Sequence, residues 1–265
     1  MRYTSAELKR LSREQLNGHW GLAIGANLIV QMIMSGLLTP FYFLIIITGN
    51  GMVQYIIYMI AAIIIAAASM VLQCGILRMY LGFARNQEVS VGMIFSEFTK
   101  RPDRYILGYF LIFILDFICM LPGTICITVG VGANTMLAVF IGVALYIVGM
   151  AALIVVSLSL AQVFMLLVEH SDMGAMEALR TSVELMQGNK GRYFYLYLSF
   201  LGWSLLGLCS CGIGMLWVTP YMMQTNVNFY RDLTGELNQG QDAGQMRSGG
   251  QDMGNGNLPD MDGLE

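Results

Sequence analysis

The sequence predicts an all-α polytopic membrane protein with six transmembrane helices in three hairpins, each preceded by a cytoplasmic amphipathic helix. Of the 265 residues, 56% are hydrophobic and only 12% are charged, whereas soluble domains carry about 25% charged residues. The mean hydropathy is +0.63 and the formal net charge is −3. This composition excludes a soluble globular enzyme, a disordered protein and a nucleic-acid-binding protein, which would carry an excess of basic residues.

Six apolar stretches are long enough to cross a bilayer, which requires about 20 residues in a helix. The predicted spans are residues 20–48, 53–82, 105–127, 135–168, 193–208 and 213–230. The fourth stretch would measure roughly 50 Å as one helix at 1.5 Å per residue. We therefore expect that helix to tilt, to protrude from the membrane or to start later than Thr135.

The basic residues predict the orientation of these spans. Lysine and arginine occur before the first span, around the junction of the second and third, between the fourth and fifth, and after the sixth. The connecting segments on the other side, residues 49–54, 128–134 and 209–214, carry no charge. Because loops rich in Lys and Arg stay in the cytoplasm, both termini are expected there. An odd number of spans would break this pattern.

A short amphipathic segment precedes each predicted hairpin. The first covers Thr4 to Asn17, within a cytoplasmic N-terminal region of residues 1–19, and Thr4 with Glu7 is predicted to form a capping box. The second covers about Ser90 to Lys100. The third covers about Asp172 to Gln187, where apolar residues recur at three- and four-residue steps. Such segments bind lipid or a partner, or they cover the cytoplasmic ends of the bundle, and we favour the covering role.

The first and third amphipathic segments align without gaps at an offset of 170 residues. The identical pairs are Glu7/Glu177, Arg10/Arg180, Ser12/Ser182, Glu14/Glu184, Gly18/Gly188 and Gly21/Gly191. The middle segment matches weakly, mainly through Arg104-Tyr105 with Arg192-Tyr193. This pattern predicts a parallel repeat of an interfacial helix followed by a hairpin, as occurs in transporters. The alternative is that similar physical demands produced similar interfacial helices.

The C-terminal segment, residues 235–265, changes character. It contains eight glycines, few apolar residues and a net charge of −5. Such a segment cannot bury enough apolar surface to fold, so we predict a disordered acidic cytoplasmic tail. The six-span membrane domain is then residues 20–234.

Asp116 is the acidic residue deepest inside a predicted span and the main candidate for a polar site within the membrane. An ionisable group there is costly and often functional, so a transporter would use it as a proton or cation site. The alternative is a structural Asp that is protonated or paired and holds helices together. Its candidate partners are Arg78, Gln31, Gln73 and Gln162.

Signatures of enzymes and cofactor sites are absent from the sequence. No G-x-S-x-G, H-E-x-x-H, P-loop or G-x-G-x-x-G pattern occurs, and the two histidines lie far apart. No cofactor and no metal site is therefore expected. Residues 169–172 read Glu-His-Ser-Asp, but neighbouring side chains on one turn point in different directions. We interpret them as a polar junction before a helix.

The C-terminal third of the chain carries sequence blocks that resemble a known family. The matching residues include Ser182, Gly188, Trp203, Gly212, Gly214, Pro220, Tyr221, Phe229 and Tyr230. With Leu16, Gly18 and Trp20 near the start, the chain resembles the bacterial integral membrane proteins grouped as domain of unknown function 975. The resemblance covers most of residues 1–234 and implies a bacterial multi-pass membrane protein, but no activity. Asp116 is not among the matching residues.

These observations favour a structural or regulatory protein of the bacterial plasma membrane. The alternative is a transporter or exporter of a small solute or ion that uses Asp116. A membrane enzyme would need a polar cluster, and none is found, so we expect no enzymatic activity. The expected partners are membrane lipids and not nucleic acid. A protein partner or a second copy of the chain is left open by the sequence.

Overall fold

The computed structural model describes residues 3–49 and 51–238, which contain helices and no strand. The elements are α1 (Ser5–Leu16), α2 (Trp20–Thr48), α3 (Met52–Ala84), the 3₁₀ helix η1 (Val91–Thr99), α4 (Asp103–Gly132), α5 (Met136–Ser159), α6 (Val163–Glu169), α7 (Ala175–Met186), α8 (Lys190–Leu198), α9 (Leu201–Cys209) and α10 (Met215–Leu233). The all-α prediction is confirmed.

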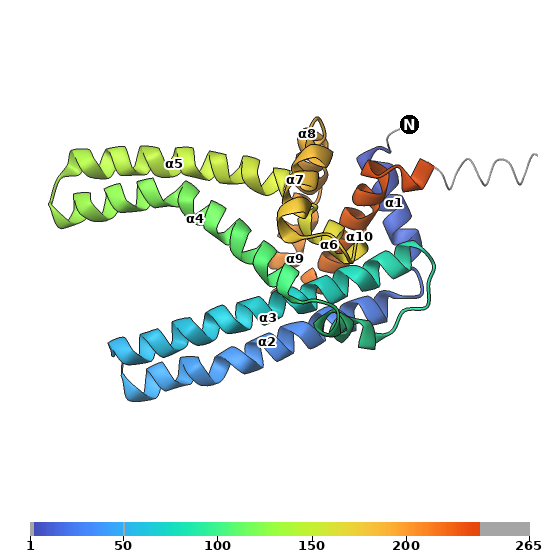
Figure 1. The fold of residues 1–265 in the computed structure, drawn as a ribbon, viewed down its shortest axis with the longest axis horizontal. Coiled ribbons are helices and arrows are strands. Elements are labelled where there is room, and N and C mark those ends of the chain that lie inside the picture. Colours follow the sequence, from blue (N-terminus) through green and yellow to red (C-terminus); the bar gives the residue numbers. More distant parts are fainter. Residues whose placement is uncertain (1–2, 50, 239–265) are drawn as a thin grey trace, which may run out of the picture.

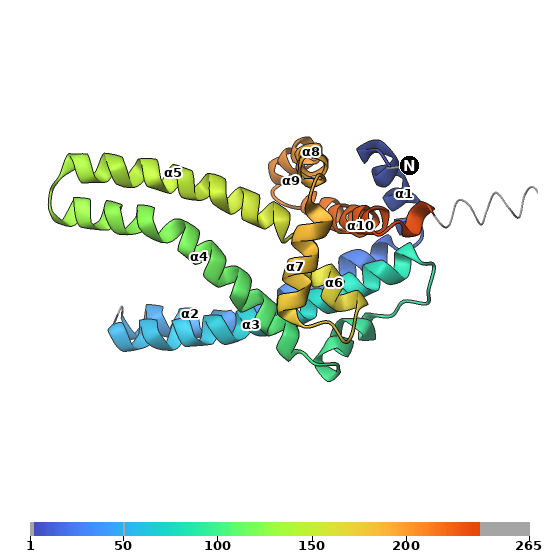
Figure 2. The same ribbon diagram turned by 45° about the horizontal axis from the view of Figure 1, so that its top comes forward.

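Two long hairpins leave a common base and diverge from each other (Figure 1). One is α2–α3 and the other is α4–α5. The short helices α1 and α7 gather at the base together with α8, α9 and α10 (Figures 1 and 2). The large buried side chains also lie in base elements, among them Tyr80, Tyr105 and Tyr230. The packed core therefore lies at the base, whereas the hairpins expose apolar side chains such as Ile64 and Phe140.

Four helices are long and apolar enough to cross a membrane among the residues described. They are α2, α3, α4 and the continuous stretch Met136–Glu169 that contains α5 and α6. These match the first four predicted spans. The fourth is not one straight helix, because residues 160–162 separate α5 from α6.

The predicted fifth and sixth spans are not confirmed as membrane-crossing helices. The stretch 193–208 is divided at residues 199–200 into α8 and α9, which have nine residues each. A nine-residue helix is about 14 Å long, less than half of a bilayer core. The sixth stretch forms α10, whose C-terminal half lies alongside α1 at the base (Figure 2).

The amphipathic segments form as predicted at two of three places. The Thr4–Glu7 capping box is present at the start of α1. The third segment forms α7, but it begins at Ala175 and not at Asp172. The second segment is a 3₁₀ helix and not an α-helix.

The repeat predicted at an offset of 170 residues reappears in the backbone. Helices α1 and α7 begin and end at equivalent residues, and α2 and α8 start at the equivalent Trp20 and Lys190. Gly18 and Gly188 between them have positive φ angles of 84° and 72°. A side chain would be strained in that conformation, so glycine permits the same turn in both copies.

Glycines bring α4 and α5 into close contact. A Cβ added to Gly123 would lie 2.6 Å from the Tyr146 backbone, and one added to Gly142 would lie 2.7 Å from the Ile127 nitrogen. Small residues of this kind allow helix backbones to approach within a membrane. Helix α4 also bends partway along its length (Figure 1), and Pro122 lies inside it.

The first residues of the predicted tail are folded. Glu236 forms ion pairs with Arg85 and Arg231, and the side chain of Leu237 is buried. Residues 235–238 therefore belong to the folded base, and the rest of the predicted tail lies outside the described residues.

Candidate functional site

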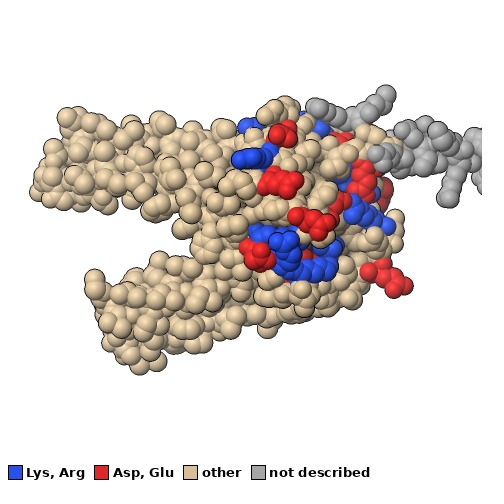
Figure 3. All heavy atoms as spheres, in the orientation of Figure 1, with Lys and Arg blue, Asp and Glu red and all other residues tan. Residues whose placement is uncertain are grey.

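Charged side chains gather at the base of the described chain, and the long hairpins beyond it show none in the view of Figure 3. These side chains form three ionic clusters. Each cluster joins the end of a hairpin to other elements of the base. They are the most polar features of the fold.

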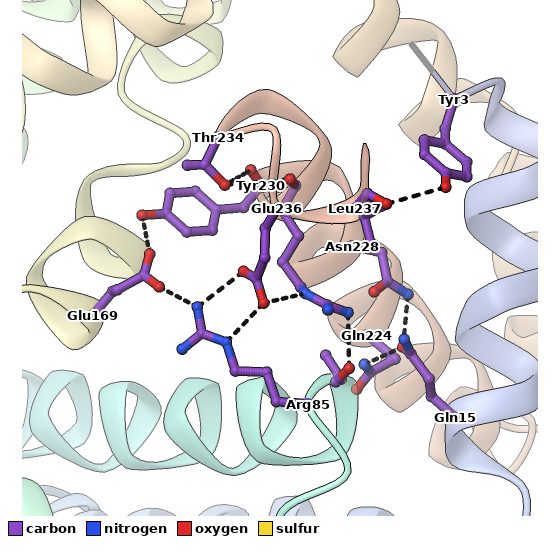
Figure 4. A network of polar contacts seen from close by, with 12 residues as sticks. Tyr3, Gln15, Arg85, Glu169, Gln224, Asn228, Tyr230, Thr234, Glu236 and Leu237 are labelled. Atoms are coloured by element: carbon purple, nitrogen blue, oxygen red, sulfur yellow. Dashed lines mark hydrogen bonds and ion pairs between the residues drawn. The ribbon is translucent and has the colours of Figure 1, made fainter. Parts of the chain in front are cut away.

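The first cluster centres on Arg85, which follows α3 (Figure 4). Its guanidinium donates two hydrogen bonds of 2.9 Å to Glu236 and pairs with Glu169 at the end of α6. Arg231 lies 3.1 Å from the same Glu236 carboxylate, and the Tyr230 hydroxyl donates to Glu169. Hydrogen bonding from Arg85 holds the pKa of Glu236 below its usual range, although burial opposes this. The cluster fastens the ends of α3, α6 and α10 together.

The second cluster surrounds Glu97, whose side chain is completely buried in η1. Arg78 of α3 pairs with it, the Tyr105 hydroxyl donates to it, and Lys100 lies 3.4 Å away. Burial raises the pKa of Glu97, but the Tyr105 hydrogen bond and the nearby cations outweigh burial and leave the pKa lowered. Glu97 is therefore held as a carboxylate. It links η1, α3 and α4.

Arg104 extends the second cluster into the segment that follows α6. Its guanidinium donates 2.7 Å hydrogen bonds to the carbonyl oxygens of His170 and Ser171. The predicted polar junction of residues 169–172 therefore has a structural role here, because its backbone is held by a buried arginine.

Arg192 holds the third cluster in the corresponding way. It pairs with Asp232 near the end of α10 and donates a 2.8 Å hydrogen bond to the carbonyl oxygen of Tyr3. Arg104 and Arg192, which the sequence comparison aligned, thus both bind the backbone that leads into an amphipathic helix, α7 or α1. The weak sequence match reflects a shared contact.

The four residues predicted as an intramembrane polar site do not come together. Asp116 lies on α4, and its Oδ1 atom is buried without a hydrogen-bond partner. Arg78 is paired with Glu97 at the base. Gln162, at the break between α5 and α6, donates a 3.1 Å hydrogen bond to Asn226 of α10. No described contact joins Asp116 to Arg78, Gln73 or Gln162.

Gln73 instead lines a separate cavity of about 310 Å³ between α2, α3 and α10. Asn27, Gln31 and Pro220 line the same cavity. The side chain of Asn27 also donates a 2.8 Å hydrogen bond to the Tyr80 hydroxyl. Its lining residues are all neutral and most of them are apolar, so the cavity lacks a charge that would select an ion. Within residues 3–49 and 51–238, no group of three His, Cys, Asp or Glu side chains could hold a metal ion.

The family-motif residues have identifiable structural roles. Ser182, in α7, accepts a hydrogen bond from the Gln162 N–H and donates one of 2.9 Å to the Ser159 carbonyl, so it bridges the break between α5 and α6. The ring of Phe229 packs 5.1 Å from that of Tyr193, and Tyr230 belongs to the Arg85 cluster. Gly188 and Gly212 have positive φ angles.

The remaining motif residues lie in α9, at the turn before α10 and along α10. A Cβ added to Gly214 would lie 2.8 Å from Gly207. Pro220 is buried inside α10, and Tyr221 packs against Phe200 with ring centroids 5.0 Å apart. Trp203 and Tyr221 also line a second cavity near α1.

Sequence reasoning missed the ionic clusters. Glu97, Arg85, Asp232 and Glu236 were not identified as a set, because their ion pairs join residues up to 151 positions apart. The available signal was their position. Each lies just outside an apolar stretch, where a carboxylate and a guanidinium from different hairpins can meet at the same depth.

The family described as "Protein of unknown function (DUF975)" matches residues 1–236, and the chain belongs to that family. The match ends at Glu236, the carboxylate of the Arg85 cluster. No curated protein and no solved structure matches the chain.

Proposed function

We propose that this DUF975 protein is an integral, non-enzymatic protein of the bacterial plasma membrane with a structural or regulatory role. The observation that carries the proposal is the ionic base. Its buried charges are used to fasten the hairpins to one another, and its arginines bind carboxylates and backbone carbonyls.

The orientation we propose places the base and both termini on the cytoplasmic side. It is supported by the concentration of Lys and Arg at the base, since cytoplasmic loops carry such an excess. The hairpin tips around Gly51 and Ala133 lie next to apolar helix ends and carry no charge. They would face the other side of the membrane.

The third hairpin decides between four and six crossings. The sequence predicts six, because no charged residue occurs between Arg192 and Arg231. The short helices α8 and α9, and the packing of α10 along α1, favour four crossings with the third hairpin in the cytoplasmic interface. We propose the four-crossing arrangement, in which the aromatic residues of α8 lie at the level of the lipid headgroups.

Cysteine labelling in intact cells tests this topology. Cys209 and Cys211 are exposed near the end of α9. With four crossings, a membrane-impermeant maleimide leaves both unlabelled until the cells are permeabilised. An Ala133→Cys variant at the α4–α5 tip should be labelled in intact cells and serves as the matched control. Labelling of Cys209 or Cys211 from outside would establish six crossings, and failure of the tip to label would refute the orientation.

Transport is the second candidate, and Asp116 is the observation in its favour. A buried carboxylate oxygen without a partner is costly in a membrane and is often functional. The test is proton or potassium flux into liposomes containing purified wild-type protein or the Asp116→Asn variant, which keeps the side-chain shape. A flux that Asp116→Asn abolishes would overturn the structural role. We expect that liposomes with either protein show the same flux as liposomes without protein.

A further inference from the structure

All three tryptophans of the chain line one cavity near α1. The cavity measures about 310 Å³, which is close to the lower end of small-molecule sites. Its lining residues are Lys9, Arg13, Trp20, Trp203, Trp217, Val218 and Tyr221. They come from four helices, α1, α2, α9 and α10. Because its lining comes from residues distant in sequence, the cavity is a product of the tertiary fold and not of a single helix.

Two cations face the cavity without a carboxylate to neutralise them. Lys9 Nζ donates a 3.0 Å hydrogen bond to the Ser199 carbonyl and lies 4.0 Å above the Phe200 ring. The Arg13 guanidinium carbon lies 6.0 Å from the Tyr221 ring centre. Neither cation forms an ion pair among the described residues, whereas Arg10 on the same helix pairs with Glu14.

The two cations also repel each other. The pKa of Lys9 is lowered, first by burial and then by the charge of Arg13. An anion between them would relieve this repulsion. A phosphate suits the pair, because Arg binds its oxygens as a planar fork and Lys as a point charge.

The aromatic residues place the cavity at a membrane surface. Trp203 is 57% exposed and Trp217 is 51% exposed, and neighbouring Leu205 and Leu206 are exposed as well. Trp20 is the first residue of the membrane helix α2. Tryptophan concentrates at the headgroup level of bilayers, so the apolar rim of the cavity can continue into the acyl region.

We infer that this cavity binds the phosphate headgroup of an anionic membrane lipid, with Lys9 and Arg13 on the phosphate and the tryptophans along the glycerol and upper acyl chains. The inference rests on the proposed membrane insertion. It assigns α1 a lipid-binding function in addition to covering the base.

Intrinsic fluorescence tests the inference, because every tryptophan lies in this cavity. The full-length protein is reconstituted with increasing fractions of brominated phosphatidylglycerol or brominated phosphatidylcholine, and quenching is measured. A Lys or Arg near an anionic surface contributes about a fivefold preference. The expected result is therefore a preference of roughly tenfold or more for phosphatidylglycerol. Equal quenching by the two lipids would refute the inference.

Variants separate this site from general electrostatics. The Lys9→Gln/Arg13→Gln double variant should lose the preference, and Lys9→Arg/Arg13→Lys should keep it. The matched control is Arg10→Gln/Arg180→Gln, which removes two exposed charges at equivalent positions of α1 and α7 and should retain the preference. A control variant that loses the preference equally would contradict the assignment to this cavity.

Two further outcomes are distinguishable. If phosphatidylglycerol is not preferred, but inorganic phosphate at about 10 mM raises the midpoint of thermal unfolding of the wild type and not of Lys9→Gln/Arg13→Gln, the site binds a soluble anion and the lipid assignment is wrong. If neither brominated lipid quenches, the protein is not inserted and the proposed membrane location fails. Quenching without a headgroup preference leaves the membrane location intact and refutes only the headgroup site.

Discussion

Gly75 on α3 gives the sharpest test of how the base is packed. A Cβ at this position would overlap the carbonyl oxygen of Ile94 in η1 and would lie 2.6 Å from its carbonyl carbon. Because ordinary contact begins at 3.4 Å, the Ile94 carbonyl carbon must retreat by about 0.8 Å when Gly75→Ala is introduced, and its closer carbonyl oxygen must retreat further. Ile94 is completely buried, and Arg78, one turn along from Gly75, pairs with Glu97 of the same η1 segment. Neither side has room to move independently.

The expected magnitude follows from two opposing terms. Overpacking of a well-packed site costs about 1–3 kcal/mol, and distortion of the buried ion pair adds to that cost. Replacing glycine in a helix returns about 0.5–1 kcal/mol. We expect a net loss of about 2 kcal/mol, which lowers the midpoint of thermal unfolding by about 4–8 °C for a chain of this size.

The assay is thermal unfolding of the purified protein in detergent. Gly36→Ala, on α2, is the matched control, since an added Cβ there meets nothing within 4 Å. It should leave the midpoint unchanged or raise it slightly. If Gly75→Ala and Gly36→Ala unfold at the same temperature, the close approach of α3 and η1 is wrong and the account of the Glu97 cluster fails with it.

Three further predictions use the same measurement. The pKa of Glu97 is lowered in the folded state, so its ionisation stabilises the protein above the unfolded value of 4.5, and this stabilisation is lost as the pH falls further. Glu97→Gln should therefore be less stable than the wild type at pH 7, and its unfolding midpoint should fall less steeply between about pH 5 and pH 3. An equally steep fall of the midpoint in both proteins would contradict the assignment. Glu236→Ala should cost about 1–3 kcal/mol through its bonds to Arg85, while Glu14→Ala, in an exposed pair with Arg10, should change stability by less than about 0.5 kcal/mol. Ser182→Ala should destabilise the protein by about 1–3 kcal/mol, because it leaves the Gln162 N–H and the Ser159 carbonyl without a hydrogen bond. Ser12→Ala should cost less, because Asn228, the partner of Ser12, retains a hydrogen bond to Gln15. The reverse order of the two losses would refute the bridging role of Ser182.

Sequence patterns within a single segment predicted those helices whose formation depends on that segment alone. Apolar length predicted α2, α3 and α4, and the Thr4–Glu7 pattern predicted the capping box of α1. The break between α5 and α6 escaped prediction, because residues 160–162 carry no proline or glycine. The interruption is held by a tertiary contact, the hydroxyl of Ser182 on the Gln162 N–H and the Ser159 carbonyl. The sequence signal for that break lay in another helix.

The candidate site was predicted less well than the fold. Asp116 attracted attention as an acidic residue in an apolar run, but an unusual residue type does not identify its neighbours. The ionic clusters are made of residue types that are ordinary at the ends of spans, and only the folded chain shows which carboxylate meets which arginine. Arg104 and Arg192 were the exception, since their weak sequence match corresponds to an equivalent contact.

The arrangement of the short segments explains why the repeat was visible at an offset of 170 residues and faint in the middle. Each segment packs on the helix that ends the preceding hairpin, η1 on α3, α7 on α6, and α1 on α10.

One buried position recurs in these contacts. The Ser12 hydroxyl accepts a hydrogen bond from Asn228, and the Ser182 hydroxyl donates one to the Ser159 carbonyl at the break before α6. Both serines therefore use their hydroxyl to bind a polar partner. The corresponding position in the middle segment, when Arg104 is aligned with Arg192, is Ile94, which meets Gly75. There the backbone of Ile94 lies against a glycine and no hydroxyl takes part, so the sequence likeness is lost although the packing is kept.

Because α1 at the start of the chain docks on α10 at its end, the three units close into a ring. Helix α1 lacks its partner helix until α10, near the other end of the chain, has been synthesised. The base is therefore not made of three separable modules, because the first unit packs on the last.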